Sequence, residues 1–164
     1  MLGEGDKSVA KEVYLEAIRL TERLHRQFLE VVKAELDSHN LDDINNVQSL
    51  ILYNIGRDEL TVGELTNRGY YLGSNVSYNV RKLVENGYLI QERSVHDRRS
   101  IRVKLSPKGL VLCDRIDAMF ERQMKALVAT GSLEDLNQAA NYYRRLERFW
   151  ISQLDYTSRV LERE

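Results

Sequence analysis

The sequence predicts a mainly α-helical chain that carries one small β-hairpin. Two observations carry this prediction. The 164 residues include a single proline and nine glycines, so long stretches contain no helix breaker. Apolar residues recur every three or four positions over most of the chain, whereas residues 88–105 alternate between apolar and polar. Period 3.6 indicates amphipathic helices, and period 2 indicates strands.

The first two helices are expected to form a long amphipathic element and a buried one. The apolar stripe that begins at Val9 continues to Leu36 and predicts a helix over residues 6–37 with Asp6 as its N-cap. After the polar break HNLDD, Asp42 or Asp43 is expected to cap a second helix that closes near Gly56. Its centre, VQSLILYNI, is apolar on most sides, which predicts burial.

Residues 61–87 predict a helix-turn-helix. Thr61 and Glu64 have the spacing of a capping box, and the short helix they begin should end at Gly69. A further helix starts at Ser74 or Asn75 and stops at Gly87, with Val76, Val80, Leu83 and Val84 along one face. Two short helices joined by a tight turn form this motif.

The alternating runs 88–93 and 101–105 flank the polar loop SVHDRRS and predict a hairpin with a projecting, arginine-rich loop, or wing. Ser106 is then expected to cap a fifth helix with Pro107 at its first position. Its expected stripe starts with Leu110, Cys113 and Ile116 and ends with Phe120, Met124 and Leu127. Thr130-Gly131 interrupts it, and a last helix follows to the end of the chain.

The terminal helices are expected to mediate homodimerisation. At 1.5 Å per residue the first helix is about 45 Å long, which exceeds the diameter of a small domain. Its stripe and that of the last helix, with Trp150 and Leu154, therefore need a partner surface. The alternative is an antiparallel pair within one chain. The expected division is an N-terminal dimerisation helix at 1–40, a winged helix-turn-helix domain at 41–109, and C-terminal dimerisation helices at 110–164.

The charge is distributed unevenly along the chain. The total is −1, yet residues 61–109 hold nine basic and four acidic side chains, a net +5, and the remainder is −6. A basic middle between acidic ends indicates a face directed at a polyanion, and the alternative is an uneven but solvated surface.

Three motifs within residues 73–109 resemble the MarR/SlyA family of dimeric winged-helix transcription regulators. Leu83-Val84-Glu85-Asn86-Gly87-Tyr88-Leu89 is similar to the end of the family's recognition helix. Asp97-Arg98-Arg99 is similar to its wing motif, and Leu105-Ser106-Pro107-Lys108-Gly109 to the segment after the wing. The resemblance covers about 35–155. The stretch NRGYYLGSNVSYN is also similar to a smaller alphaproteobacterial branch, the LdtR-type regulators of cell-envelope genes.

Two departures limit what the resemblance implies. Tyr78 stands where the family often has Arg or Lys, so base preference does not transfer. The peroxide-sensing branch carries a reactive cysteine in its first helix, and this chain has none there. The lone Cys113 lies on an apolar stripe, where a cysteine behaves as a small hydrophobe.

The candidate DNA-contacting residues fall on the fourth helix and the wing. A helix fits the major groove of double-stranded DNA, and asparagine there can pair with adenine. Arg99 is expected in the minor groove, where the potential is most negative, with Asp97 orienting it. Lys104 and Lys108, if they contact DNA, should contact phosphate. The predicted set is Ser74, Asn75, Ser77, Tyr78, Arg81 and Lys82 on the helix, and Arg93, Asp97, Arg98 and Arg99 on the wing.

The leading functional hypothesis is a dimeric DNA-binding regulator, expected to be a repressor of a palindromic operator and to respond to a small, partly apolar effector. The resemblance implies an effector pocket, for which Tyr14, Tyr53, Phe120 and Tyr143 are candidates, although such aromatics are more often core. The alternatives are a ligand-independent or architectural DNA binder, and a helical protein-interaction adaptor.

Enzymatic chemistry is not expected. The chain shows no nucleophile–base pair, no HExxH and no phosphate-binding loop, and we expect no metal or cofactor. His25, His39 and His96 lack ligand spacing, and the alternative is a weak metal site formed by His39 with Asp37, Asp42 and Asp43. No apolar run reaches the roughly 20 residues that span a bilayer, and the N-terminus lacks the apolar core of a signal peptide. We therefore expect a cytoplasmic protein without a membrane partner.

Overall fold

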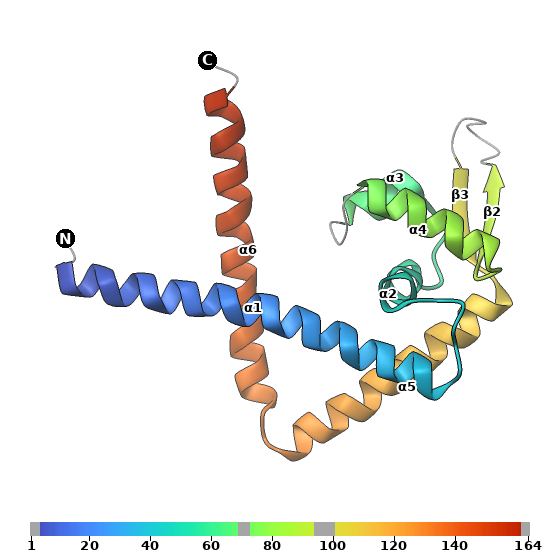
Figure 1. The fold of residues 1–164 in the computed structure, drawn as a ribbon, viewed down its shortest axis with the longest axis horizontal. Coiled ribbons are helices and arrows are strands. Elements are labelled where there is room, and N and C mark those ends of the chain that lie inside the picture. Colours follow the sequence, from blue (N-terminus) through green and yellow to red (C-terminus); the bar gives the residue numbers. More distant parts are fainter. Residues whose placement is uncertain (1–3, 69–72, 94–100, 162–164) are drawn as a thin grey trace. The chain divides into compact units, whose positions relative to one another are not determined.

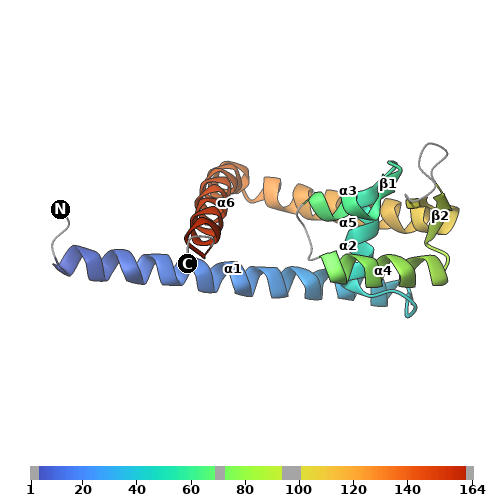
Figure 2. The ribbon, with the colours of Figure 1, turned by 90° about the horizontal axis from the view of Figure 1, so that it is seen from above.

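The computed structural model describes residues 4–68, 73–93 and 101–161 (Figures 1 and 2). It divides into two compact units, residues 1–119 and 120–164. It is mostly helical with a small antiparallel sheet, as the sequence predicts. The elements are α1 (Glu4–Ser38), α2 (Asn46–Ile55), β1 (Leu60–Thr61), α3 (Val62–Asn67), α4 (Gly73–Glu85), β2 (Leu89–Arg93), β3 (Ile101–Leu105), α5 (Pro107–Ala129) and α6 (Leu133–Leu161).

The long first helix is confirmed, but its predicted cap is wrong, because α1 begins at Glu4 and Asp6 lies inside it. Its C-terminus is a Schellman motif, in which Leu41 N–H donates to Leu36 O and Asn40 N–H donates to Asp37 O. Asn40 takes the left-handed conformation that this motif requires, with φ of 54°. Asparagine tolerates that conformation better than most side chains, which explains why the helix ends here.

The cap of α2 is also corrected. Asn45, not Asp42 or Asp43, is the N-cap, and it forms a capping box with Gln48. Asp43 is engaged elsewhere, because its carboxylate accepts hydrogen bonds from Tyr88 and Lys108. The predicted end at Gly56 is confirmed, and its N–H donates to Leu52 O.

The helix-turn-helix prediction is confirmed, with shifted boundaries. Thr61 and Glu64 form the predicted capping box, but α3 ends at Asn67 rather than at Gly69. The Arg68 guanidinium then donates to Asn54 O and to Asp58, which ties this end of α3 to the end of α2. The fourth helix begins at Gly73, so Ser74 and Asn75 lie inside it and neither is its cap.

The hairpin is confirmed, and β1 adds a third strand that the sequence pattern does not reveal. The strand order is β1-β3-β2, all antiparallel, with Leu89 opposite Leu105 and Arg93 opposite Ile101. β1 pairs Leu60 with Val103, and its two residues are too few to show any alternation. The hairpin is thereby held to the start of α3.

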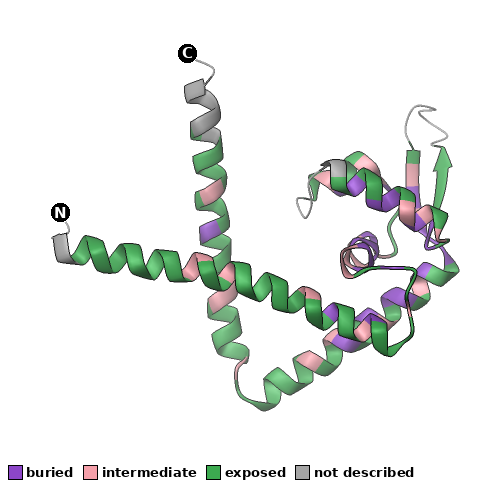
Figure 3. Cartoon of the chain, viewed as in Figure 1, coloured by how far each residue is buried: buried purple, intermediate pink, exposed green. Residues whose placement is uncertain are grey.

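The core of the first unit lies between the end of α1, α2, α3, α4, the sheet and the first half of α5 (Figure 3). Each fully buried aliphatic side chain there contributes about 1.5–3 kcal/mol relative to exposure. On α5 the expected stripe is only partly right: Cys113 and Ile116 are buried, but Leu112 and Met119 replace Leu110 and Phe120 on the buried face. The most deeply buried large side chains are Val32, Ile51, Leu52, Ile55, Leu65, Val76, Leu83, Tyr88, Val103 and Ile116.

The start of α5 lies against the start of β2 through Ser106 and Gly109. Ser106 N–H donates to Tyr88 O, its hydroxyl donates to Gly87 O, and Gly109 N–H donates to the Ser106 oxygen. A Cβ on Gly109 would lie 2.3 Å from Tyr88 O. The glycine is therefore required by the close approach of two backbone segments.

A cluster around Asp43 closes the same corner. Tyr88 O–H donates to Asp43 Oδ1 over 2.7 Å, and Lys108 Nζ donates to Asp43 Oδ2 while lying 4.0 Å from the Tyr88 ring centroid. Burial raises the pKa of the Asp43 carboxyl, but the bonds from Lys108 and Tyr88 outweigh it, and the net pKa lies below its usual value. The loop before α2 is thus tied to both β2 and α5.

Substituting Gly109 by alanine should lower the free energy of unfolding by about 1–3 kcal/mol, since a methyl group must displace backbone atoms. Urea denaturation followed by circular dichroism measures the effect. The matched control is Gly63→Ala in α3, where the nearest atom to the new Cβ is 3.9 Å away. That variant should keep or gain stability, and equal stability of Gly109→Ala and wild type would show that the corner tolerates a side chain.

Candidate nucleic-acid interface

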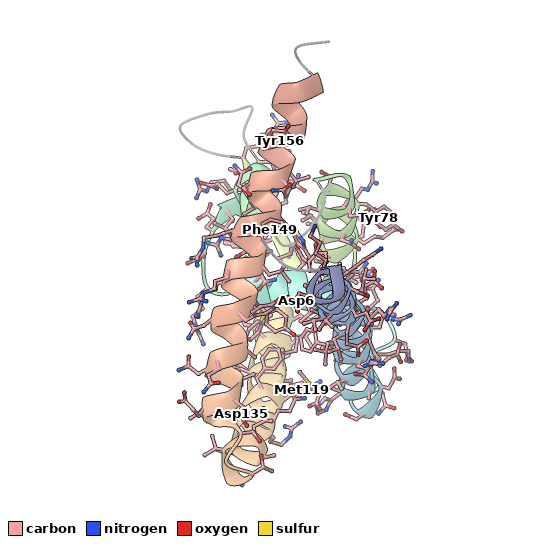
Figure 4. The ribbon with its side chains drawn as sticks, turned by 90° about the vertical axis from the view of Figure 1, so that its left-hand side faces the viewer. Asp6, Tyr78, Met119, Asp135, Phe149 and Tyr156 are labelled. Atoms are coloured by element: carbon pink, nitrogen blue, oxygen red, sulfur yellow. The ribbon has the colours of Figure 1, made fainter. Side chains whose placement is uncertain are left out.

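Helix α4 presents one apolar and one polar face. Val76, Val80 and Leu83 are buried in the core of the first unit. The opposite face exposes Asn75, Ser77, Tyr78 and Arg81, so the structure brings these predicted residues together (Figure 4 labels Tyr78). Lys82 is half-buried, and the side chain of Ser74 lies outside the described part of the molecule.

Tyr78 and Arg81 form a pair on this face. The Arg81 guanidinium carbon lies 5.9 Å from the Tyr78 ring centroid, which is within the range of a cation–π interaction. Tyr78 remains 52% exposed. The pair therefore presents an aromatic ring and a positive charge side by side to solvent.

Most of the other basic residues of 61–109 that the structure describes are already in ion pairs. Lys82 Nζ lies 2.7 Å from Glu85, and Lys104 Nζ lies 2.7 Å from Glu92. The hydrogen bonds to these carboxylates raise the pKa of both lysines, so they remain charged but locally neutralised. The remaining pairs are Arg68–Asp58, Arg102–Glu59 and Lys108–Asp43.

These pairs reduce the charge surplus that the sequence predicts for residues 61–109. Asp43, Asp58 and Glu59 lie outside that window, so a count along the chain misses their effect. Among the described residues, neither Arg81 nor Arg93 forms a salt bridge. The basic character of the described surface is therefore concentrated on α4 and at the end of β2, where Arg93 is exposed.

The other wing residues, Asp97, Arg98 and Arg99, fall outside the described residues, as does His96. The strands that carry this loop are described: Arg93 ends β2 and Ile101 begins β3, directly opposite each other. The roles of the three residues stay predictions.

A cavity of about 370 Å³ lies within the first unit beside Tyr53. The Tyr53 hydroxyl donates to Asp117 Oδ1 over 2.9 Å, and this bond raises the tyrosine pKa. Of the four aromatic residues predicted for an effector pocket, Tyr14, Phe120 and Tyr143 are not among its lining residues. Tyr14 and Tyr143 are exposed on α1 and α6. The lining is Tyr53, Gly56, Arg57, Leu105, Leu110, Cys113, Asp114 and Asp117.

Cys113, which lines this cavity, is buried as the sequence predicts. Burial, together with the nearby charge of Asp114, raises the pKa of its thiol to about 11. The thiolate is the reactive form, so this cysteine is a weak nucleophile at neutral pH.

Other site chemistry is limited in the described ranges. They contain no group of three or more His, Cys, Asp or Glu side chains able to hold a metal ion. In the same ranges, no helix is both long and apolar enough to cross a bilayer. His39 Nε2 lies 3.3 Å from Glu35 Oε1 on α1, so the imidazole contacts a carboxylate four residues earlier in the chain.

One buried polar contact, between α2 and α4, is not among the contacts expected from the sequence. Gln48 of α2 and Asn79 of α4 are both buried, and Gln48 Nε2 donates to Asn79 Oδ1 over 3.2 Å. The available signal was the position of Asn79, which shares the helical face of Val76, Val80 and Leu83. An amide at such a core position requires a buried partner.

The comparisons with known proteins agree with this geometry. The MarR family model matches residues 42–100, a range that holds α2, the helix-turn-helix and β2 and ends before β3. The exopolysaccharide II synthesis transcriptional activator ExpG of Rhizobium meliloti (strain 1021) is 36% identical over 154 residues, covering 93% of this chain and 78% of the relative.

Two solved structures share the fold. S. aureus MepR, crystallised with DNA, superposes with a TM-score of 0.66 at 21% identity over 80% of this chain and 96% of MepR. S. aureus MarR, in complex with salicylate and kanamycin, gives 0.70 at 22% identity over 88% and 97%. The hairpin is therefore the wing of a winged helix, and the chain belongs to the MarR family of DNA-binding transcription regulators.

Proposed function

We propose that the protein is a homodimeric, sequence-specific regulator that places α4 of each copy in the major groove of a palindromic operator. The observation that carries the proposal is the polar face of α4. It exposes an amide, a hydroxyl, an aromatic ring and a guanidinium, while the helix has no acidic residue before Glu85. Such a face meets base edges and phosphates without like-charge repulsion.

Within the groove, Asn75 near the helix N-terminus reads adenine through N6 and N7, and Tyr78 contacts a thymine methyl group. Arg81, held beside the Tyr78 ring, reaches guanine or phosphate. Ser74 and Ser77 contact bases or phosphate at shorter range. Lys82 contributes less, because Glu85 already compensates its charge.

The wing supplies the second contact. Arg93 and Arg98 bind phosphate, and Arg99 enters the adjacent minor groove, where A/T-rich sequence narrows the groove and strengthens its negative potential. Asp97 orients Arg99 rather than touching DNA, since a carboxylate would repel phosphate.

Dimerisation follows from the apolar side chains that α1 and α6 expose. These side chains are exposed within the single chain, and a long row of exposed apolar side chains is unfavourable in water. A second copy that packs against the same helices covers them and creates the two-fold symmetry that a palindrome matches. The exposed apolar residues include Val9, Val13, Leu15, Leu20, Leu24 and Val31 on α1, and Leu133, Leu136, Phe149 and Ile151 on α6.

The direction of regulation depends on where an operator lies relative to its promoter. A repressor is expected from the sequence, whereas the relative ExpG is named an activator. We therefore propose DNA binding in either case, with repression or activation set by the position of the operator.

A small, partly apolar effector has a site available in the cavity beside Tyr53. The cavity is bounded by α2, the end of β3 and α5, and therefore adjoins the sheet that carries the wing. A molecule bound in this cavity would contact the end of β3, which is one of the two hairpin strands. S. aureus MarR, which shares this fold, is in complex with salicylate and kanamycin in its solved structure, and this supports the proposal of an effector site.

Selection of bound fragments from random DNA tests the proposal as a whole. The expected result is enrichment of a two-fold symmetric sequence whose half-sites lie about one helical turn apart. No enrichment over unselected DNA would overturn the proposal.

Asn75→Ala should reduce discrimination against the wrong base at one position in each half-site by about 1–3 kcal/mol, because a bidentate amide–adenine contact is lost. Titration of the selected operator and of variants changed at single positions measures it. The matched control is Asn137→Ala, an exposed asparagine of α6 outside the winged domain. If Asn75→Ala keeps wild-type discrimination at every position, Asn75 does not read a base.

Arg93→Ala should weaken binding to operator and random DNA alike and lower the slope of log K against log salt by about one unit. Lys104→Ala, on the neighbouring strand, should change the slope much less, because Glu92 already pairs with the ammonium group. Fluorescence anisotropy at two salt concentrations compares them. Equal slope changes in the two variants would contradict the assignment.

A further inference from the structure

Helix α4 carries an amide where its packing face calls for an apolar side chain. Asn79 lies three residues after Val76 and four before Leu83, on the stripe that contacts the core, and it is 9% exposed. Its partner Gln48, on α2, is 7% exposed. Burying these amides removes them from water, which is unfavourable unless each forms hydrogen bonds.

The two amides belong to a continuous chain of hydrogen bonds. Asn45 N–H donates to Gln48 Oε1, and Gln48 Nε2 donates to Asn79 Oδ1, each over 3.2 Å. Asn79 Nδ2 then donates to Asn75 O over 2.9 Å. Among the described residues, no buried side-chain nitrogen or oxygen lacks a partner. The chain thus runs from the cap of α2 to the backbone of Asn75.

The same end of α2 is anchored on α1. Asn46 Nδ2 donates to Leu29 O over 3.0 Å, across 17 residues of sequence. The neighbouring residues Asn45 and Gln48 form the capping box. One short segment of α2 therefore holds α1 through Asn46 and α4 through Gln48.

Apolar packing alone leaves the rotation of α4 weakly determined, because hydrophobic burial is non-directional. A helix with side chains has a radius of about 5–6 Å, so a rotation of about 20° moves an exposed side-chain tip by about 2 Å. Base contacts depend on hydrogen bonds that weaken steeply with such errors. A directional bond on the buried face fixes the rotation at which the opposite face is presented.

We infer that Gln48 and Asn79 are positioning residues, which set the rotation of α4 on α2 so that Asn75, Tyr78 and Arg81 meet their base pairs. The inference rests on the proposed function of α4. A buried polar residue that specifies register at some cost in stability is known from coiled coils, where one core asparagine does so.

This role differs from a purely stabilising one in what it predicts. Replacing both partners of a buried hydrogen bond by apolar groups of similar shape is often neutral or stabilising. A double variant, Gln48→Met with Asn79→Leu, removes both partners of the bond between the helices, but it also removes the acceptor of Asn45 N–H in the capping box. It should therefore remain folded, with an unfolding temperature lowered by no more than the loss of that cap contact. A positioning role predicts that it nonetheless loses the ability to tell its operator from random DNA.

The experiment measures the ratio of the dissociation constants for random DNA and for the selected operator, on one preparation of each variant. An unfolded fraction scales both constants equally, so the ratio reports only on the folded protein. Asn79→Leu alone keeps the Asn45–Gln48 capping box and removes the bond between helices, which separates the two effects of Gln48. Asn79→Ser replaces the amide with a smaller side chain and is a second test of the loss of the bond between the helices.

The matched control is Ser49→Ala. Ser49 is fully buried on the same helix, but its hydroxyl donates to Asn46 O within α2 and does not reach α4. Its loss should leave the ratio unchanged.

The expected result is a fall of about tenfold in the ratio for Asn79→Leu and for the double variant, which is the discrimination that one misplaced base contact costs. A double variant with the wild-type ratio would overturn the positioning role while leaving the proposed function intact. A wild-type protein that binds operator and random DNA equally would instead overturn the proposed function itself.

Discussion

The close approach of two backbone segments at Gly109 is the constraint on which the winged unit depends. Tyr88 O lies only 2.3 Å from the position that a Cβ of residue 109 would take, so the first turn of α5 packs against the start of β2. Ser106 reinforces the approach from one side, and Asp43, bridging Tyr88 and Lys108, closes the other. The hairpin, the end of α4 and the loop before α2 thereby share one anchored corner, and β2 begins at this corner.

The basic residues of the winged unit divide into those that form structural ion pairs and those that are available to DNA. Lys108 pairs with Asp43 at this corner, Arg102 pairs with Glu59 beside β1, and Lys104 pairs across the hairpin with Glu92. Arg81 and Arg93 have no such partner among the residues described. Within the described ranges, few basic side chains are therefore left unpaired for DNA, and a net charge near zero is compatible with a DNA-binding surface. In the function that we propose, specificity depends on how accurately α4 is held.

Much of the fold could be predicted from the sequence, because the periods of apolar residues and the capping residues are local signals. The helix-turn-helix, the hairpin and the Thr61–Glu64 box follow from spacing alone. The cap of α2 could not be predicted, since Asp43 is drawn away by Tyr88 and Lys108, which lie far along the chain. The two-residue β1 exists only because β3 lies beside it.

The candidate site was predictable to a similar degree. The polar face of α4 follows from its period, and the four exposed residues on it confirm that reading. The ion pairs with Asp58, Glu59 and Asp43 join segments distant in sequence, so a charge count along the chain overstates the basic surface. The Gln48–Asn79 bond spans 31 residues, and only the misplaced amide in the stripe of α4 indicated it.

The proposal that a homodimer binds a palindromic operator through α4 and the wing is tested most directly by a hydroxyl-radical footprint on the selected operator. The footprint locates backbone protection at single-nucleotide resolution. We expect two equal sets of protected positions, related by two-fold symmetry about the operator centre and about 10 base pairs apart. Each set should include protection in the flanking minor groove, where we propose that the wing binds. A single asymmetric protected region, or protection that leaves the flanking minor grooves open, would contradict the account.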